Sequence, residues 1–70
     1  MIISNEINNI PANTIYLLHV AGKYVTQSYK YNDLRREIRR IDSHLEHGDI
    51  YRYAITDPRN TLIERGWIRG

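Results

Sequence analysis

The sequence predicts an α+β fold of the ββαββ type: a four-stranded, mainly antiparallel sheet with one helix packed on one face. Two observations predict the strands and the helix. Two pairs of segments rich in β-branched and aromatic residues flank short turn sequences. Between the pairs, apolar residues recur at helical spacing. With 70 residues and no cysteine, the chain is expected to form one small domain, residues 1–70, without disulfides.

Residues 1–13 are expected to be a mostly irregular lead-in, although Ile2 and Ile3 could begin a short edge strand. The segment holds four residues that favour turns, namely Asn5, Asn8, Asn9 and Pro11. It lacks the charged-then-apolar layout of a signal peptide, and no apolar run reaches the length of a membrane span. We therefore expect a cytoplasmic protein that does not enter membranes.

A first hairpin is expected from residues 14–20 and 24–30, with Gly22 in a type II′ turn. This pairing places five residues on a core face: Tyr16, Leu18, Val20, Val25 and Tyr29. The other face then carries Ile15, Leu17 and His19, which is more apolar than a solvated face should be. Because a chain this short buries little of its own surface, we expect a twofold dimer to cover that face.

A helix is expected over residues 32–47. Its apolar stripe consists of Leu34, Ile38, Ile41 and Leu45, at intervals of four, three and four. Asn32 or Asp33 can cap its start, and Gly48 can end it in a left-handed conformation.

A second hairpin is expected from residues 50–56 and 61–68. Pro58 favours a type I turn, and Asn60 can take the left-handed position after it. With this turn, three pairs share one face: Ile55 with Ile63, Tyr53 with Arg65, and Tyr51 with Trp67. The pairing favours Trp67 in the core, where its replacement by alanine would unfold the domain. The alternative is an exposed binding platform made of Tyr51, Tyr53, Arg65 and Trp67, in which case that variant would stay folded and lose its partner.

Four arginines on the helix, Arg35, Arg36, Arg39 and Arg40, form the first candidate site. A solvated helix face is one interpretation. However, like charges stand four residues apart, and the arginines come early in the helix, where the helix dipole disfavours them. Guanidinium groups suit either phosphates or a carboxylate-bearing protein surface.

The sheet is the second candidate site, because one helix leaves one sheet face free. Six tyrosines, one tryptophan and no phenylalanine suit half-buried positions and interfaces. With Arg52 and Arg65 nearby, these aromatic residues could also stack nucleic-acid bases. No RNP-type motif is present to support RNA binding.

Catalysis has little support in the sequence. There is no phosphate loop, nucleophile elbow or HExxH motif, and His19 has no assignable nucleophile partner. His44 and His47 lie one turn apart without further ligands, so neither a metal nor a cofactor is expected.

One local pattern resembles the opening of the GIY-YIG nucleases: Ile15-Tyr16, then Gly22-Lys23-Tyr24-Val25, then Asp33-Leu34-Arg35-Arg36. Thr14 and Thr26 stand where that family has glycines, and no metal-binding glutamate helix follows. A degenerate nuclease fragment is therefore a remote alternative, and its activity is not carried over.

The sequence thus predicts a non-catalytic binding protein, an accessory factor or inhibitor that contacts another protein. The residues expected to take part are Arg35, Arg36, Arg39, Arg40, Ile15, Leu17, Arg52 and Arg65. The alternative is a small nucleic-acid-binding protein that uses the helix arginines. A net charge of only +2 favours the protein partner.

Overall fold

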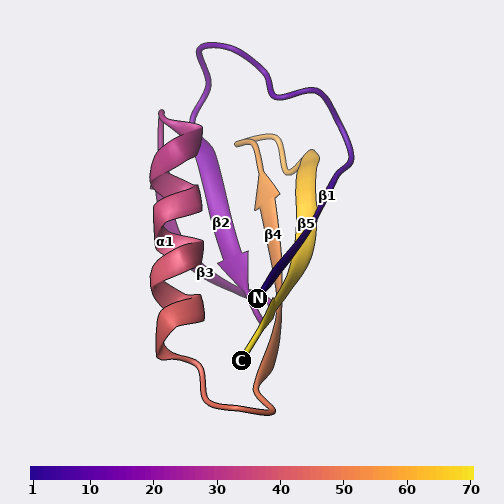
Figure 1. Cartoon of the computed structure of the whole chain (residues 1–70). Helices are drawn as coiled ribbons and strands as arrows, with labels where there is room; N and C mark the ends of the chain where they lie inside the picture. Colours follow the sequence, from indigo (N-terminus) through magenta and orange to yellow (C-terminus); the bar gives the residue numbers. More distant parts are fainter.

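The computed structural model describes residues 1–70 as one antiparallel sheet with a single helix packed on one face (Figure 1). The chain order is β1 (Ile2–Glu6), β2 (Tyr16–Val20), β3 (Lys23–Ser28), α1 (Tyr31–His44), β4 (Ile50–Thr56) and β5 (Leu62–Arg69). The strands lie side by side in the order β1-β5-β4-β2-β3. The predicted α+β class is confirmed. The predicted four strands are wrong, because there are five.

The additional strand is β1, in the segment expected to be irregular. It pairs antiparallel with β5, placing Ile2 opposite Ile68 and Glu6 opposite Glu64. Ile2 packs against the core, and the amides of Ile7 and Asn8 both donate to the carbonyl of Ile63. Without β1, the backbone groups along that edge of β5 would lack these partners. The lead-in therefore becomes ordered through contacts with the far end of the chain.

The core lies between α1 and the sheet, where eight hydrophobic residues are buried: Tyr16, Leu18, Leu34, Ile38, Tyr53, Ile55, Ile63 and Ile68. The predicted helix stripe is confirmed, since Leu34 and Ile38 are fully buried and Ile41 and Leu45 pack against the cluster. The helix is neither long nor apolar enough to span a membrane.

The helix boundaries differ from those predicted. Helix α1 begins at Tyr31 after Lys30, which makes no side-chain cap bond, so the proposed caps Asn32 and Asp33 lie inside the helix. Instead, Asp33 accepts a 2.6 Å hydrogen bond from Ser28 Oγ. Gly48 is left-handed, with a φ of 94°, but in the turn after the helix has ended.

The turn of the first hairpin lies one residue earlier than predicted. Its central residues are Ala21 and Gly22, with φ of 54° and 77°, which is the pattern of a type I′ turn rather than type II′. Val20 therefore faces Lys23, and Val25 is the extra residue of a bulge in β3. The predicted core positions Val25 and Tyr29 are wrong, since both side chains are exposed.

The second hairpin has the predicted turn but a different register. Asn60 is left-handed, with a φ of 66°. A bulge between β4 and β5 then shifts the pairing by one residue, so Tyr53 faces Gly66 and Tyr51 faces Ile68. Because side chains alternate along a strand, this shift moves Arg65 and Trp67 to the opposite face. The core position predicted for Trp67 is wrong, because its side chain is 42% exposed.

Candidate binding surface on the sheet

The side of the sheet that faces away from α1 has no covering element, and we call it the open sheet face. It is formed by alternate residues of all five strands: Ile3, Asn5, Leu17, His19, Tyr24, Ile50, Arg52, Ala54, Leu62, Arg65, Trp67 and Arg69. A β-sheet with one helix must leave such a face to solvent or to a partner. Here the free face carries a tryptophan and three arginines, Arg52, Arg65 and Arg69.

Trp67 lies on β5, the second strand from one edge of this face. It is directly opposite Ile3 of β1 on one side and Arg52 of β4 on the other. The guanidinium carbon of Arg52 lies 5.6 Å from the centre of the indole ring, a cation–π geometry. Arg65 precedes Trp67 by two residues on the same strand, so its side chain points to the same side. Arg52, Arg65 and Trp67 form a cationic aromatic cluster.

Two shallow hollows flank this cluster, and all three of its residues line both of them. One hollow extends over β4 towards the turn between β2 and β3, and the other extends towards β1. No aspartate or glutamate lines either hollow. With no nearby carboxylate, the positive charge of Arg52 and Arg65 is left to solvent or to a bound anion.

On the part of the open sheet face formed by β2 and β3, the side chains contact one another and their neighbours. The imidazole Nε2 of His19 lies 3.1 Å from Thr56 Oγ1, and its ring meets Tyr24 edge to face at 6.3 Å. Leu17 is half-buried between β3 and β4, and Ile15 is half-buried in the loop before β2. Leu17 therefore belongs to the open sheet face, whereas Ile15 stands outside the strands.

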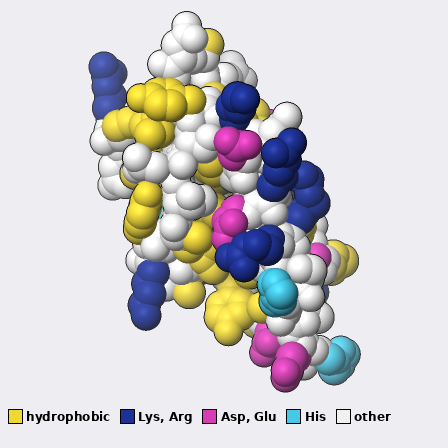
Figure 2. All heavy atoms as spheres, turned by 90° about the vertical axis from the view of Figure 1, so that its left-hand side faces the viewer, with side chains coloured by type: hydrophobic (Ala, Val, Ile, Leu, Met, Phe, Trp, Pro, Cys, Tyr) yellow, Lys and Arg dark blue, Asp and Glu magenta, His cyan; other side chains and the backbone are white.

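The helix side of the molecule presents a different electrostatic pattern. Figure 2 shows basic and acidic side chains next to each other over α1. Arg40 pairs with Glu37 and lowers the pKa of that carboxyl, and Arg36 lies 3.9 Å from Asp33. Arg39 is exposed and has no ion pair. The helix arginines therefore do not form a single unpaired cationic patch.

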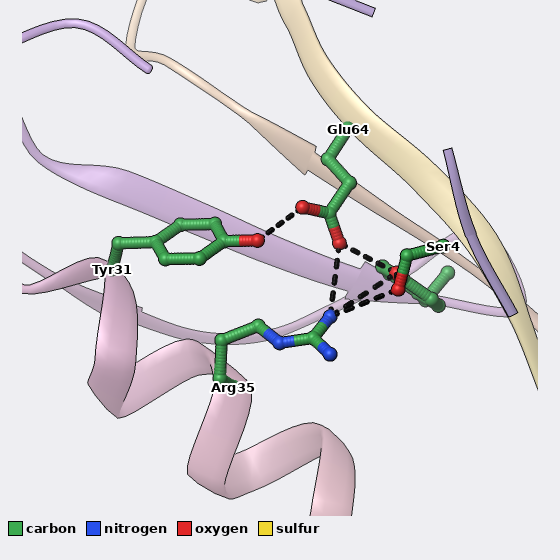
Figure 3. Close-up of polar contacts among 5 residues, drawn as sticks. Ser4, Tyr31, Arg35 and Glu64 are labelled. Atoms are coloured by element: carbon green, nitrogen blue, oxygen red, sulfur yellow. Dashed lines mark hydrogen bonds and ion pairs between the residues drawn. The ribbon is translucent and has the colours of Figure 1, made fainter. Parts of the chain in front are cut away.

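Arg35 takes part in an internal network instead. Its guanidinium Nη1 lies 3.1 Å from Glu64 Oε2 and donates to Ser4 Oγ at 3.1 Å (Figure 3). Tyr53 donates to the same carboxylate oxygen at 2.5 Å, and Tyr31 donates to the other oxygen. Glu64 is 3% exposed, so this network compensates an otherwise costly buried charge. Its position between α1 and the sheet indicates a structural role for Arg35.

The two tyrosines of this network give a testable pH dependence. Burial, and then the hydrogen bond to Glu64, raise the pKa of Tyr31 and that of Tyr53 above the ordinary value. The unfolded chain ionises tyrosine near pH ~10, while the folded chain keeps these two protonated. Their contribution to stability is therefore complete below about pH 10 and is lost as the pH rises towards their folded pKa values.

We expect the free energy of unfolding to fall above about pH 10, and to fall less steeply in a Tyr31→Phe variant, which has one shifted group fewer. Urea unfolding at several alkaline pH values measures both slopes. Tyr24→Phe is the matched control, because Tyr24 is exposed and lies outside the network. Equal slopes for wild type and Tyr31→Phe would contradict the assignment.

Among the predicted site residues, the structure brings together Arg52 and Arg65, and places Leu17 on the same face. It places the helix arginines on the other side of the molecule, with Arg35 turned inward. The sequence favours Trp67 in the core over an exposed platform, and it does not point to Ile3 or Asn5 as surface residues. Gly66 signals only a close backbone approach, which a glycine inside a strand often marks, and not the bulge at Ile63 that turns Trp67 to the open sheet face.

Comparison with protein families, with curated proteins and with solved structures finds no match for this chain. The resemblance to GIY-YIG nucleases therefore remains confined to its short pattern. Three residues of that pattern have structural roles here: Tyr16 and Leu34 are buried in the core, and Arg35 pairs with Glu64.

Proposed function

We propose that this protein is a non-catalytic binding protein, an accessory factor or inhibitor, that contacts another protein through the open sheet face. The observation that supports this most is the position of Trp67. This single tryptophan is 42% exposed beside Arg52 and Arg65, on a face that no other element covers. Tryptophan and arginine are the residues that most often dominate the binding energy of protein interfaces.

The surroundings of Trp67 also support a protein partner. Ile3 and Ile50 lie on the same face with 41% and 52% of their surface exposed. Contiguous exposed apolar side chains mixed with arginine are typical of an interface centre. A partner that covered these two side chains would remove their apolar surface from water, which would stabilise the complex.

Self-association of this chain stays a prediction. The positive charge of the open sheet face disfavours a dimer in which two copies meet through this face. A twofold dimer places the same patch on both copies, so Arg52 and Arg65 would approach their own counterparts. With no carboxylate lining either hollow, like charges would meet in the interface. We therefore favour a different protein as the partner of this face.

A nucleic-acid partner is the second candidate, now for the sheet rather than the helix. An exposed tryptophan beside two arginines also suits base stacking and phosphate contacts. The helix version has less support, because Arg35 is bound internally and Arg36 and Arg40 lie beside carboxylates.

Two charge-matched variants separate these possibilities. Arg52→Ala with Arg65→Ala removes two positive charges from the sheet, and Arg36→Ala with Arg39→Ala removes two from the helix. We expect the sheet variant to lose the proteins that wild type captures from nuclease-treated extract, while the helix variant retains them. Both should stay folded, because exposed substitutions usually change stability by less than about 0.5 kcal/mol. Loss of every partner upon nuclease treatment, or loss only in the helix variant, would contradict the proposal.

A further inference from the structure

We infer that the open sheet face binds an extended, acidic stretch of polypeptide in which apolar side chains flank a carboxylate. This inference rests on the proposed function and gives it a partner chemistry. It follows from the shape, the lining and the charge of the surface around Trp67.

The shape is a cationic ridge between two hollows. The hollow over β4 has a volume of about 680 Å³, and the one towards β1 has about 350 Å³. Arg52, Arg65 and Trp67 line both, so they stand between them. A ligand that fills both hollows must cross these three side chains.

The lining of each hollow includes aliphatic groups. Ile50, Ala54 and Leu62 contribute to the first hollow, and Ile3 contributes to the second. A leucine-sized side chain placed there would remove apolar surface from water on both partners. A sugar–phosphate backbone would leave these groups without an apolar partner, so the lining favours a polypeptide over a nucleic acid.

The positive charge of Arg52 and Arg65 favours a carboxylate at the point where the ligand passes between the two hollows. Arg52 and Arg65 offer guanidinium groups that can pair with a carboxylate through two parallel hydrogen bonds. Neither arginine forms an ion pair within the protein, whereas Arg35, Arg36 and Arg40 all have an acidic neighbour. An acidic side chain of the partner would supply the missing counter-charge.

The spacing of an extended chain matches this arrangement. Neighbouring strands lie about 4.8 Å apart, so β1 and β4, on the two sides of β5, are separated by roughly 10 Å. Residues four apart in an extended peptide lie about 13 Å apart on the same side, and the residue midway between them points the same way. The pattern Leu-Xaa-Glu-Xaa-Leu therefore places a glutamate over the ridge and a leucine over each hollow.

The test is a titration with the blocked peptide Gly-Ser-Leu-Ser-Glu-Ser-Leu-Ser-Gly, followed by Trp67 fluorescence and by backbone amide chemical shifts. Three ligands serve as controls: the same peptide with glutamine for glutamate, the same peptide with serine for both leucines, and an oligodeoxythymidine. We expect the glutamate peptide to bind at least about tenfold more tightly than the glutamine or the serine version, and more tightly than the oligonucleotide. In an Arg52→Gln and Arg65→Gln variant, the preference for glutamate over glutamine should disappear.

Equal affinity for the glutamate and glutamine peptides, or no detectable binding of the glutamate peptide, would overturn the inference. Tighter binding of the oligonucleotide would overturn it in favour of nucleic acid. The proposed function would survive the first two results if captured proteins still required Arg52 and Arg65 after nuclease treatment. The proposed function fails separately if the capture of proteins after nuclease treatment does not depend on Arg52 and Arg65.

Discussion

Arg35→Ala is expected to leave the domain largely unfolded at room temperature. Glu64 is 3% exposed and carries the only carboxylate that pairs with Arg35, so the variant would keep a buried charge without its counter-charge. Breaking a buried ion pair in this way typically costs about 3–5 kcal/mol. The hydrophobic core of a domain this small supplies a total stability of roughly the same size. Urea unfolding followed by circular dichroism measures the loss.

Arg39→Ala is the matched control for this prediction, because Arg39 lies one turn further along α1 but is exposed and unpaired. Its effect should stay within about 0.5 kcal/mol. A double variant, Arg35→Met with Glu64→Gln, should recover much of the stability, because no buried charge remains. The amide oxygen accepts from one tyrosine, and the amide NH2 can donate to the hydroxyl oxygen of the other. Similar melting of Arg35→Ala and Arg39→Ala would show that the network contributes little.

Gly66→Ala is expected to be the second severely destabilising change. A Cβ at this position would lie 2.0 Å from the carbonyl oxygen of Ile3 and 2.5 Å from a ring carbon of Tyr53. Glycine is required here because the Tyr53 ring lies across β5 to reach Glu64. Overpacking usually costs about 1–3 kcal/mol. A clash with strand backbone should reach the upper end of that range, because β1 would have to separate from β5.

Amide hydrogen exchange tests this second prediction most specifically, since the β1 amides should lose protection before those of β2 and β4. Gly48→Ala is a useful comparison, because nothing lies within 4 Å of its added methyl group and only the left-handed backbone is strained. That variant should lose about 1 kcal/mol. If Gly66→Ala were as stable as Gly48→Ala, the close approach of β1 and Tyr53 to Gly66 would be wrong.

The helix and the second turn could be predicted from the sequence because their signals are local, whereas the first turn differs from the predicted type. The helical spacing of Leu34 and Ile38 can be read from neighbouring residues, and both side chains are buried in the core. The left-handed conformation of Asn60 depends only on the turn in which it lies. Strand β1 could not be predicted in the same way. Its order depends on pairing with β5, at the other end of the chain, and its residues have no strong strand pattern of their own.

The candidate site was only partly predictable because two bulges shift the strand registers. Ile63 is the unpaired residue of the bulge in β5, so both Ile63 and Glu64 are buried and the alternation restarts one residue later. A charged residue in a strand is normally expected to face solvent, so Glu64 gave no sign of its burial. The structure places Arg52 and Arg65, two of the predicted site residues, on the open sheet face, whereas the face predicted for Trp67 is wrong.

The proposed binding surface requires Trp67 to be an exposed side chain in a cationic environment, and fluorescence quenching tests this directly. The protein has a single tryptophan, so its emission reports on the open sheet face alone. We expect strong quenching by iodide and weaker quenching by caesium, because Arg52 and Arg65 raise the local concentration of anions. The difference should fall with added neutral salt. Blue-shifted emission that neither ion quenches would place Trp67 in a core and contradict the proposed binding surface.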